Sequence, residues 1–409
     1  MTSSTDSSTS PSPASLPWVR RLVAIDTTSR DSNLPLIELV AQELRDLGLE
    51  PDIFPDETGA KANLVVTVPA ADGTRAGGVM LSGHTDVVPV DGQAWESDPF
   101  DVQIRDGRLY GRGSADMKSF IAVALEALPR VVQTPLREPL HLALTYDEEV
   151  GCLGGAQIVK QIADLGIAPR ACIVGEPTSM RVITGHKSMN VVAVTFHGVA
   201  AHSSLTPNGV NAIEYAASFI RYVRERAERW RADGPFDGAY PVTYTTAGVN
   251  IVAGGVAANT VADRCRLELD FRTIPSVDPA EVVAGLRAEV ARVEQLMKQE
   301  NDAARVEVEV LAAVPAFEAV EDSGAVALAV ALGAGEAAER VTYGTEAGQF
   351  AGTGVDTIVC GPGDIAQAHG PNEYVELDQL LACEEFVARL VAELAVAGDD
   401  AGAEPGTTA

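Results

Sequence analysis

Histidines and carboxylates gather in short segments of this sequence, most of them directly after a run of apolar residues. The residues that could hold a metal ion or move a proton are His84, Asp86, Asp116, Glu148, Glu149, Glu176 and His369. Two imidazoles and several carboxylates, with no thiolate among them, suit zinc, cobalt or manganese. Because carboxylates can bridge metal ions, this set predicts two ions about 3.5–4 Å apart, not one.

Neighbouring residues in these segments can take different roles. Asp86 lies two residues beyond His84, so it could accept the ring proton of that histidine and orient it. Glu148 and Glu149 are adjacent on a backbone that is extended or turning, so their side chains diverge. One of them can bind metal while the other acts as a general base toward a water molecule.

Each of these residues also has a structural interpretation. A single histidine is more often a core or surface residue than a ligand, and an isolated pair of glutamates is usually solvated. The functional interpretation is favoured because four predicted strand ends carry such residues at once. We interpret His141 and His197 as structural and Cys152 as a packed thiol, and leave His186 undecided.

The apolar runs before the candidate residues predict strands that are buried on both faces. They are Asn63–Val68, Val79–Leu81, Leu140–Thr145, Ala171–Val174 and Thr357–Cys360. Helical patterns occur between and before them, at Leu16–Gly48, Met117–Val132 and Gly154–Leu165. Alternating strands and helices predict an α/β domain with a mainly parallel sheet. Ligands of such sheets bind outside the carboxyl ends of the strands, so the candidate residues can converge there.

The pattern changes near Met189 and changes back near Pro315. Between these points, longer strands are predicted at Asn190–His197, Val242–Val252, Val261–Phe271 and Val306–Leu311, and helices at Asn211–Arg231 and Pro279–Glu300. Two helices on one face of an antiparallel sheet make a small α+β domain. We therefore expect a discontinuous metal-binding domain over 16–189 and 315–397, with a second domain inserted over 190–314.

Composition excludes several classes of protein. The chain has 409 residues, 46% of them hydrophobic, and a net charge of −28 at pH 7. A surface this acidic repels nucleic acid and anionic lipid, so we expect neither as a partner. No apolar run approaches the roughly 18 residues of a membrane span. Residues 1–15 and 398–409 are predicted disordered tails, and the 5 scattered cysteines predict a reduced, cytoplasmic protein.

The motifs around the candidate residues resemble one enzyme family. They are SGHTDVVP, WESDPF, GRGSADMK, DEEVG, GEPTS, AHSS and AHGPNEY, spread from about Trp18 to Leu394. The family is that of the dimetal amidohydrolases and metallopeptidases, which includes acetylornithine deacetylases, succinyl-diaminopimelate desuccinylases, aminoacylases and glutamate carboxypeptidases. The resemblance implies a zinc-peptidase-like catalytic domain, with the inserted domain as a lid and dimerisation domain.

The resemblance also implies a role for each candidate residue. It implies His84, Asp116 and Glu176 as ligands of one ion, and Asp116, Glu149 and His369 as ligands of the other, with Asp116 bridging. Glu148 would be the general base, and Asp86 would orient His84. A cis peptide bond is expected between Asp116 and Met117.

The inserted domain would contribute to the same site by resemblance. His202 of the AHSS motif would stabilise the oxyanion, typically across a dimer. Arg272 and Asn259 are similar to the family positions that hold the substrate carboxylate. We therefore expect a homodimer formed through residues 190–314.

Within the family, the segments GEPTSM, GHKS, AAHSSLTPNGVNAIEY and YGTEAGQF are most similar to the enzymes that deacetylate N2-acetyl-L-ornithine. The resemblance thus implies hydrolysis of this amide to L-ornithine and acetate, in arginine biosynthesis, with two zinc or cobalt ions. Glu346 of YGTEAGQF would attract the ammonium group of the substrate and repel an added carboxylate. Alternatively, Glu346 caps the helix that starts near Ala347.

Two other functions stay open. One is a related N-acyl amino acid hydrolase, namely a succinyl-diaminopimelate desuccinylase, an aminoacylase or a dipeptidase. A desuccinylase would be expected to carry a segment similar to GGTSDGRF where this chain has YGTEAGQF. The other is a non-catalytic, metal-binding partner protein of the same fold. The presence of Glu148 argues against it, because a binding protein has no need of a general base.

Overall fold

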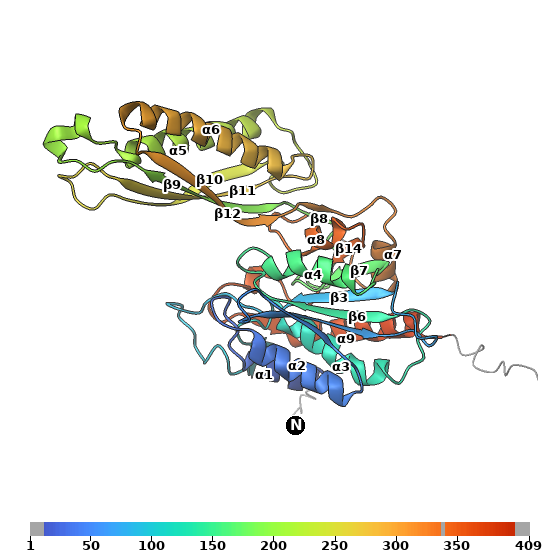
Figure 1. The fold of residues 1–409 in the computed structure, drawn as a ribbon. Helices are drawn as coiled ribbons and strands as arrows, with labels where there is room; N and C mark the ends of the chain where they lie inside the picture. The colour runs from blue at the N-terminus through green and yellow to red at the C-terminus, as the bar shows by residue number, and fades with distance from the viewer. Residues whose placement is uncertain (1–11, 337–339, 397–409) are drawn as a thin grey trace, which may run out of the picture.

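The computed structural model describes residues 12–336 and 340–396 of the chain (Figure 1). These residues form two parts, each with its own sheet and its own buried apolar side chains. The larger part is built from both ends of the described chain, and the smaller part from the segment between them (Figure 1).

The larger part contains a sheet of six strands in the order β1-β2-β6-β3-β7-β14. The strands are β1 (Asp52–Pro55), β2 (Ala62–Val68), β3 (Val79–His84), β6 (Leu140–Thr145), β7 (Ala171–Val174) and β14 (Asp356–Val359). β6, β3, β7 and β14 run parallel to one another, whereas β1 and β2 are antiparallel to their neighbours. The predicted α/β class with a mainly parallel sheet is confirmed, and the antiparallel strands lie at one edge.

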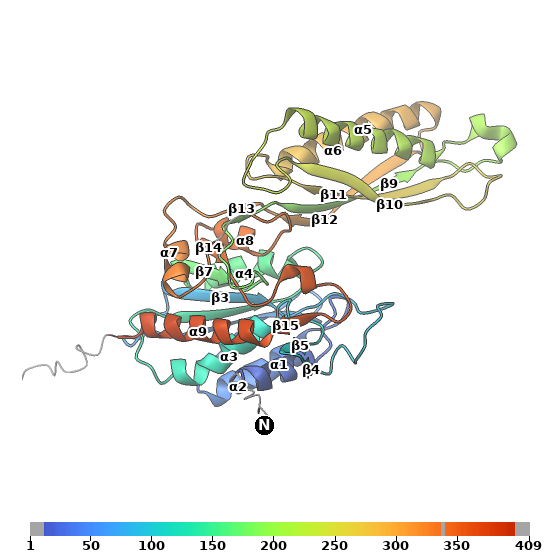
Figure 2. The same ribbon diagram turned by 180° about the vertical axis from the view of Figure 1, so that it is seen from behind.

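Helices cover both faces of this sheet (Figures 1 and 2). One face packs against α1 (Leu16–Val23), α2 (Leu34–Asp46), α3 (Lys118–Val131) and α9 (Leu377–Leu394). The other face packs against α4 (Leu153–Asp164) and α8 (Ala347–Ala351), and α7 (Gly324–Ala331) lies beside β14. Successive residues of a strand point to opposite faces, so Leu64 and Val66 join the first core while Val65 joins the second.

The helical segment predicted over Leu16–Gly48 is two helices, α1 and α2, with a polar loop between them. In this loop Thr27 Oγ1 donates a hydrogen bond to the Thr85 carbonyl (2.6 Å), and Ser29 Oγ donates one to Asp86 Oδ2 (2.6 Å). Short hydroxyl side chains that bond elsewhere compete with a helical backbone. Pro35 then lies in the first turn of α2, where a missing N–H is tolerated. The prediction of one continuous helical segment was therefore wrong.

The smaller part is an antiparallel sheet of four strands in the order β10-β11-β9-β12, covered on one face by two helices (Figure 1). Its elements are β9 (Met189–His197), α5 (Ala212–Asp233), β10 (Thr246–Gly254), β11 (Arg264–Arg272), α6 (Pro279–Glu300) and β12 (Arg305–Val314). The buried residues of β11 alternate with more exposed ones, and Leu267 and Phe271 join the core beneath α5 and α6. All six elements lie within or within one residue of the range 190–314 predicted for the inserted domain.

Several short elements complete the described chain. They are β4 (Gln103–Arg105), β5 (Arg108–Tyr110), β8 (Gly185–His186), η1 (Ser203–Asn208), β13 (Phe317–Glu318), η2 (Ile365–Gln367) and β15 (Tyr374–Glu376). β15, β5 and β4 form a three-stranded sheet, and β13 pairs with β8. The three-stranded sheet joins the chain just before Asp116 to the chain just after His369, two of the predicted metal ligands.

Most of the two predicted tails lies outside the described residues, which begin at residue 12 and end at residue 396. Ser15, however, belongs to the folded protein, because it is buried and its N–H and Oγ both donate to Glu384 Oε1. The predicted tail was therefore too long at that point. Among the described residues, no helix combines the length and the apolar character that crossing a membrane requires.

Candidate metal centre

The two predicted histidine ligands meet at one carboxylate. His84 Nε2 lies 2.9 Å from Asp116 Oδ1 and 3.9 Å from Glu176 Oε2. On the other side, His369 Nε2 lies 3.3 Å from Asp116 Oδ2 and 2.9 Å from Glu149 Oε2. Each oxygen of Asp116 thus faces a different histidine, which is the arrangement that a bridging ligand requires.

Four of these ligands follow the strands of the large sheet or end them. His84 is the last residue of β3, which is longer than predicted because its pairing with β6 continues to Thr145. Glu149 follows β6, Glu176 follows β7, and His369 lies in the segment after β14. Parallel strands end at the same edge of a sheet, and this edge is where the predicted residues converge. Asp116 comes from the turn before α3, and its peptide bond to Met117 is cis, as predicted.

The donor set fits divalent cations. Ligand atoms of His84, Asp116 and Glu149 lie within 4.8 Å of one another, as do those of His84, Glu148 and Glu176. Glu149 Oε1 and Glu176 Oε1 are buried and have no hydrogen-bond partner among the residues that the structure describes. Buried carboxylate oxygens without a partner are costly unless a cation or another donor approaches them.

Electrostatics of the cluster support the same conclusion. Burial, together with the Asp116 carboxylate, raises the pKa of Glu149 to about 7. Burial also opposes ionisation of Asp116, but hydrogen bonds from His369 and His84 hold its pKa below the usual value. Hydrogen bonds to Asp116 and Glu149 raise the pKa of His369 to about 10. In the metal-free protein, protons on these groups offset the negative charge of the carboxylates. A bound divalent cation would offset that charge instead, so metal binding must release protons.

Glu148 differs from Glu149 in its surroundings. Its carboxylate lies beside His84 and Glu176, and its Oε1 accepts a hydrogen bond from Cys152 Sγ (3.3 Å). Burial raises the pKa of Glu148 well above its usual value, with a further contribution from the Glu149 carboxylate. Burial raises the pKa of the Cys152 thiol in the same way, so this cysteine is a neutral donor and not a nucleophile.

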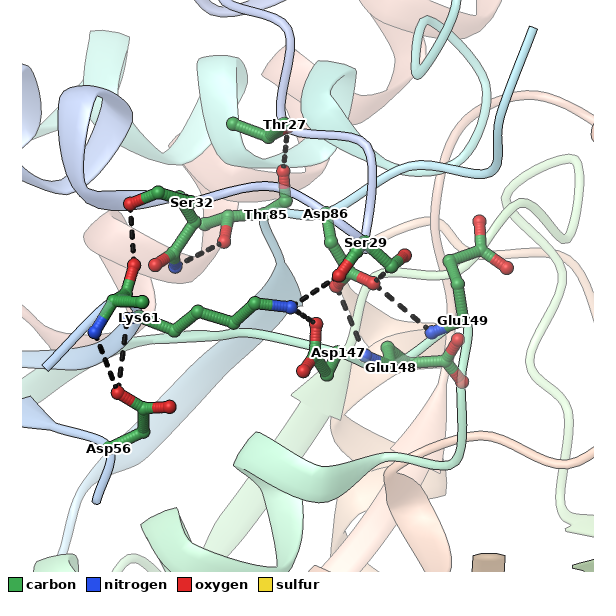
Figure 3. A network of polar contacts seen from close by, with 12 residues as sticks. Thr27, Ser29, Ser32, Asp56, Lys61, Thr85, Asp86, Asp147, Glu148 and Glu149 are labelled. Carbon is green, nitrogen blue, oxygen red and sulfur yellow. Dashed lines mark hydrogen bonds and ion pairs between the residues drawn. The ribbon is translucent and has the colours of Figure 1, made fainter. Parts of the chain in front are cut away.

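Asp86 holds the two adjacent glutamates through their backbone (Figure 3). Its Oδ1 accepts a hydrogen bond from the Glu148 N–H (3.0 Å), and its Oδ2 accepts one from the Glu149 N–H (3.3 Å). The predicted contact with His84 is less direct: the carboxylate lies 3.6 Å from His84 Nδ1, while the Asp86 carbonyl lies at 3.0 Å. Asp86 therefore orients His84 mainly through its main chain and orients the glutamates through its side chain.

A lysine that the sequence did not single out supports the same turn (Figure 3). Lys61 Nζ donates to Asp147 Oδ1 and to the carbonyl of Ser29, whose hydroxyl bonds Asp86. Asp147 has a φ of 55°, a left-handed conformation that a residue with a side chain rarely adopts. In the sequence, the only signal for this ion pair is Asp147 itself, a third acidic residue directly before the two glutamates. Its partner Lys61 lies 86 positions away.

The predicted residues of the inserted domain do not join this cluster within one chain. His202 is exposed and its Nδ1 pairs with Ser204 Oγ (2.7 Å), and the exposed Asn259 accepts a hydrogen bond from the Ser203 N–H (3.0 Å). His202 follows the His197 end of β9, and Asn259 lies in the segment before β11 that pairs with it there. Met189, where the chain enters from the larger part, is at the other end of β9. β9 has 9 residues, so its two ends are separated by about 30 Å.

Arg272 lies at the opposite end of the inserted sheet from His202. Its neighbour Phe271 pairs with Asn190, and its guanidinium contacts Asp270 Oδ1 (3.2 Å). The structure therefore separates Arg272 from Asn259, although both were predicted to hold the same substrate carboxylate. Within a single chain the two residues cannot hold one carboxylate in this conformation.

Glu346 is only 1% exposed and lies beneath the site. Burial raises its pKa to about 7, and its side chain makes no capping hydrogen bond to α8. Glu346 thus occupies the N-cap position of α8, as the alternative interpretation expected, but its side chain does not act as the cap. The predicted contact with a substrate ammonium stays a prediction, because the buried carboxylate presents almost no surface to a ligand here.

The other histidines are structural, as expected for two of them. His141 is buried between Thr67 Oγ1 and the Gly77 carbonyl, each 2.9 Å from a ring nitrogen, and His197 pairs with Glu307 (3.1 Å). His186, left undecided, is buried: its Nδ1 faces the Lys187 carbonyl (2.8 Å) and its Nε2 accepts from the Thr345 N–H (3.3 Å). His186 thus anchors the segment that carries Glu346.

Buried carboxylates and two histidines at the strand ends of an α/β domain, with a further glutamate beside them, define a metal-dependent hydrolase. Residues 80–393 match the family described as Peptidase family M20/M25/M40, and the chain belongs to this family. It is thus a metal-dependent amidohydrolase.

Two acetylornithine deacetylases are each 35% identical to the chain. The one from Proteus mirabilis (strain HI4320) matches over 91% of this chain and 93% of its own length. The one from Myxococcus xanthus matches over 93% of this chain and 97% of its own length. Their alignments therefore include the inserted domain as well as the metal centre.

Solved structures share the whole fold. A metallo-carboxypeptidase of the M20 family from Sulfolobus solfataricus has a TM-score of 0.71 at 17% identity, covering 92% of this chain and 98% of that chain. A dinuclear metal-binding peptidase of the same family from Bacillus subtilis has a TM-score of 0.63 at 13% identity, covering 93% and 97%. The fold of a catalytic domain with an inserted domain is therefore that of the family.

Proposed function

We propose that the protein, an N-acyl amino acid hydrolase, acts on N2-acetyl-L-ornithine and releases L-ornithine and acetate, as in arginine biosynthesis. Its similarity to two acetylornithine deacetylases over more than nine-tenths of the chain supports this substrate. The single observation that carries the hydrolytic mechanism is the placement of Asp116 between two histidines, with the buried Glu148 beside them.

The proposal assigns two metal ions to this cluster. His84, Asp116 and Glu176 would hold one ion, and Asp116, Glu149 and His369 would hold the other. When bound, such ions polarise the amide carbonyl and lower the pKa of a water molecule to about 7. The mixture of imidazole and carboxylate ligands suits zinc, and cobalt is the next candidate.

Glu148 is the proposed general base. It takes a proton from the attacking water and returns a proton to the leaving amine. The raised pKa of Glu148, caused by burial, suits a carboxyl group that must both accept and donate a proton near neutral pH. Cys152 and the Asp86 network hold this glutamate in position during both transfers.

The proposal includes a homodimer formed through residues 190–314. His202 and Asn259 would then serve the metal centre of the partner subunit, because about 30 Å of β9 separates them from their own catalytic domain. β10 is an edge strand of the inserted sheet, and its Ile251 and Val252 are exposed. An exposed apolar edge is a surface on which a second sheet can pair.

Arg272 is the proposed partner of the substrate carboxylate from the enzyme's own subunit, because its guanidinium offers two parallel hydrogen bonds. The cytoplasm is the proposed compartment. In the described part of the chain, the cysteines Cys152, Cys172, Cys265, Cys360 and Cys383 are all buried and free, which is typical of proteins in a reducing environment.

A product-release assay tests the proposed substrate. The protein loaded with zinc would be given N2-acetyl-L-ornithine, N-succinyl-diaminopimelate and several N-acetyl amino acids, with chelator-treated protein as the control. We expect the highest kcat/KM for N2-acetyl-L-ornithine. A higher value for another acyl amino acid would assign the protein to a related member of the family, and no hydrolysis of any amide would favour the non-catalytic alternative.

A further inference from the structure

The two proposed metal ions differ in how their histidine ligands are held. His84 is buried in β3 and its ring is fixed between Asp116 and the Asp86 carbonyl. The His369 side chain is 53% exposed and lies in a loop, with a left-handed φ of 62°. Packing alone therefore cannot fix His369, and its position depends on its ring contacts with Asp116 and Glu149 and also on contacts made by its main chain.

One such contact comes from a glutamine far away in the sequence. Gln93 Nε2 donates a hydrogen bond to the carbonyl of His369 (2.8 Å), and Gln93 Oε1 accepts one from Arg112 Nη2 (2.6 Å). The same two segments meet a second time where the Glu96 N–H donates to Asn372 Oδ1 (2.9 Å). The loop that carries His369 is thus fastened to the segment around Gln93.

Arg112 continues the chain of contacts to the bridging ligand. Its Nη1 lies 2.6 Å from Glu373 Oε2, and both side chains are only 1% exposed. The other oxygen of Glu373 accepts hydrogen bonds from the backbone N–H groups of Ala115 (2.8 Å) and Asp116 (3.1 Å). The hydrogen bonds and the ion pair of Glu373 thus serve the main chain of Ala115 and Asp116 and the guanidinium of Arg112.

We propose that Gln93, Arg112 and Glu373, together called the clamp, are positioning residues. They hold His369 and Asp116 in the places that these two ligands need to bind one metal ion. This inference rests on the proposed dimetal function. The clamp reaches two of the three ligands of the Asp116–Glu149–His369 ion. It touches the other ion only through Asp116, whose partner His84 is held independently. Loosening the clamp should therefore weaken one ion much more than the other.

Gln93 offers a direct test, because it is half-buried and its replacement leaves the ion pair between Arg112 and Glu373 in place. In Gln93→Met the side chain keeps its length but can neither donate to His369 nor accept from Arg112 Nη2 and Trp95 Nε1. Gln103→Met is the matched control: Gln103 is a half-buried glutamine of the same region, and its amide bonds only Asp101. Glu373→Gln is a second variant, which removes the charge that faces Arg112.

Metal-free proteins would be titrated with Zn²⁺ by calorimetry and with Co²⁺ by visible absorption, and melting temperatures of the metal-free proteins recorded. We expect the wild type and Gln103→Met to bind two ions. Gln93→Met should bind the first ion normally and the second about 10-fold more weakly, and Glu373→Gln should show a loss of up to about 100-fold, the usual range for residues that support metal ligands. Melting temperatures should differ little between Gln93→Met and Gln103→Met.

Two results would overturn the clamp while leaving the proposed function intact. One is unchanged binding of both ions by Gln93→Met and by Glu373→Gln. The other is an equal weakening of both ions, which would show a general structural role. By contrast, a wild-type protein that binds fewer than two ions would contradict the proposed function itself, and it would do so without any variant.

Discussion

His84 and His202 show how differently the two parts of the molecule hold their candidate functional residues. His84 is 1% exposed, ends a central strand and contacts other ligands directly. His202 is exposed and follows the His197 end of β9, where its Nδ1 contacts Ser204 Oγ. His84 is buried among other candidate ligands of its own chain, whereas His202, which we propose to serve a partner chain, is exposed. Burial therefore identifies most of the metal cluster, although the His369 side chain is 53% exposed, and it cannot identify residues that would act only after assembly.

Replacing Glu148, the proposed general base, should produce the largest effect and separate its role from that of Glu149. Glu148→Ala should lower kcat by roughly 10²–10⁴-fold with both metal ions retained, because the share of a general base is lost while the ligands remain. Kinetics combined with metal analysis would check this. Glu149→Ala is the comparison, and it should lose one ion. An ion-free Glu148→Ala protein with a fully loaded Glu149→Ala protein would reverse the two roles.

The exposed histidine gives the next largest effect and tests the comparison directly. His202→Ala should lower kcat by roughly 10²–10³-fold, the usual cost of losing an oxyanion donor. Mixing His202→Ala with Glu148→Ala should restore part of the activity after subunit exchange, since a mixed dimer can contain one intact site. Exchange would be verified with differently tagged subunits. Confirmed exchange without recovered activity would place His202 in its own subunit's site or outside catalysis.

Two buried histidines of the larger part should each contribute a loss of stability in acid. Burial lowers the pKa of His141 and of His186 to about 4. In the unfolded chain a histidine has a pKa of about 6.5, so the unfolded state binds more protons between these values. Each of these two histidines should therefore lower the free energy of unfolding as the pH falls from about 6.5 to about 4, by up to about 3 kcal/mol. The buried Glu149 and Glu346 act in the opposite direction over this range, because their pKa is raised to about 7 and the folded state binds their protons first.

Urea unfolding of the wild type and of His141→Gln between pH 7 and pH 4 would isolate the contribution of His141 as a difference. The stability of His141→Gln relative to the wild type should increase as the pH falls, and the exposed His202→Gln serves as the control. If His141→Gln and the wild type lose stability in parallel, burial of neutral His141 does not determine the acid sensitivity.

The smallest effect concerns substrate choice. If Glu346 attracts the ammonium of ornithine, Glu346→Gln should raise the KM for N2-acetyl-L-ornithine by about fivefold, equivalent to ~1 kcal/mol, and spare N-acetylmethionine. Equal changes for both substrates would make Glu346 a structural residue, in agreement with its burial.

The sequence predicted the parts of the site that depend on single strands. Leu140–Thr145 and Ala171–Val174 are strands with the predicted bounds, and the ligands after them converge because parallel strands share one edge. The burial pattern of β11 also follows from local alternation. In these cases the information lies within a few consecutive residues.

Long-range polar contacts could not be predicted in the same way. Gln93 meets His369 across 276 positions, and Lys61 meets Asp147 across 86. No periodicity links such pairs, because each is created by the tertiary fold. The break between α1 and α2 has the same origin, since Thr27 and Ser29 bond residues that follow β3.

The chain enters the inserted domain at Met189 and leaves it at Val314, and these residues are partners in the pairing of β9 with β12. The two junctions are therefore neighbours across one ladder of an antiparallel sheet. A short hairpin turn could connect them with little gap to close, so the insertion adds little loop-closure entropy to the folding of the catalytic domain. We therefore expect that a short turn in place of the inserted domain would leave the strands of the metal centre connected in their present order.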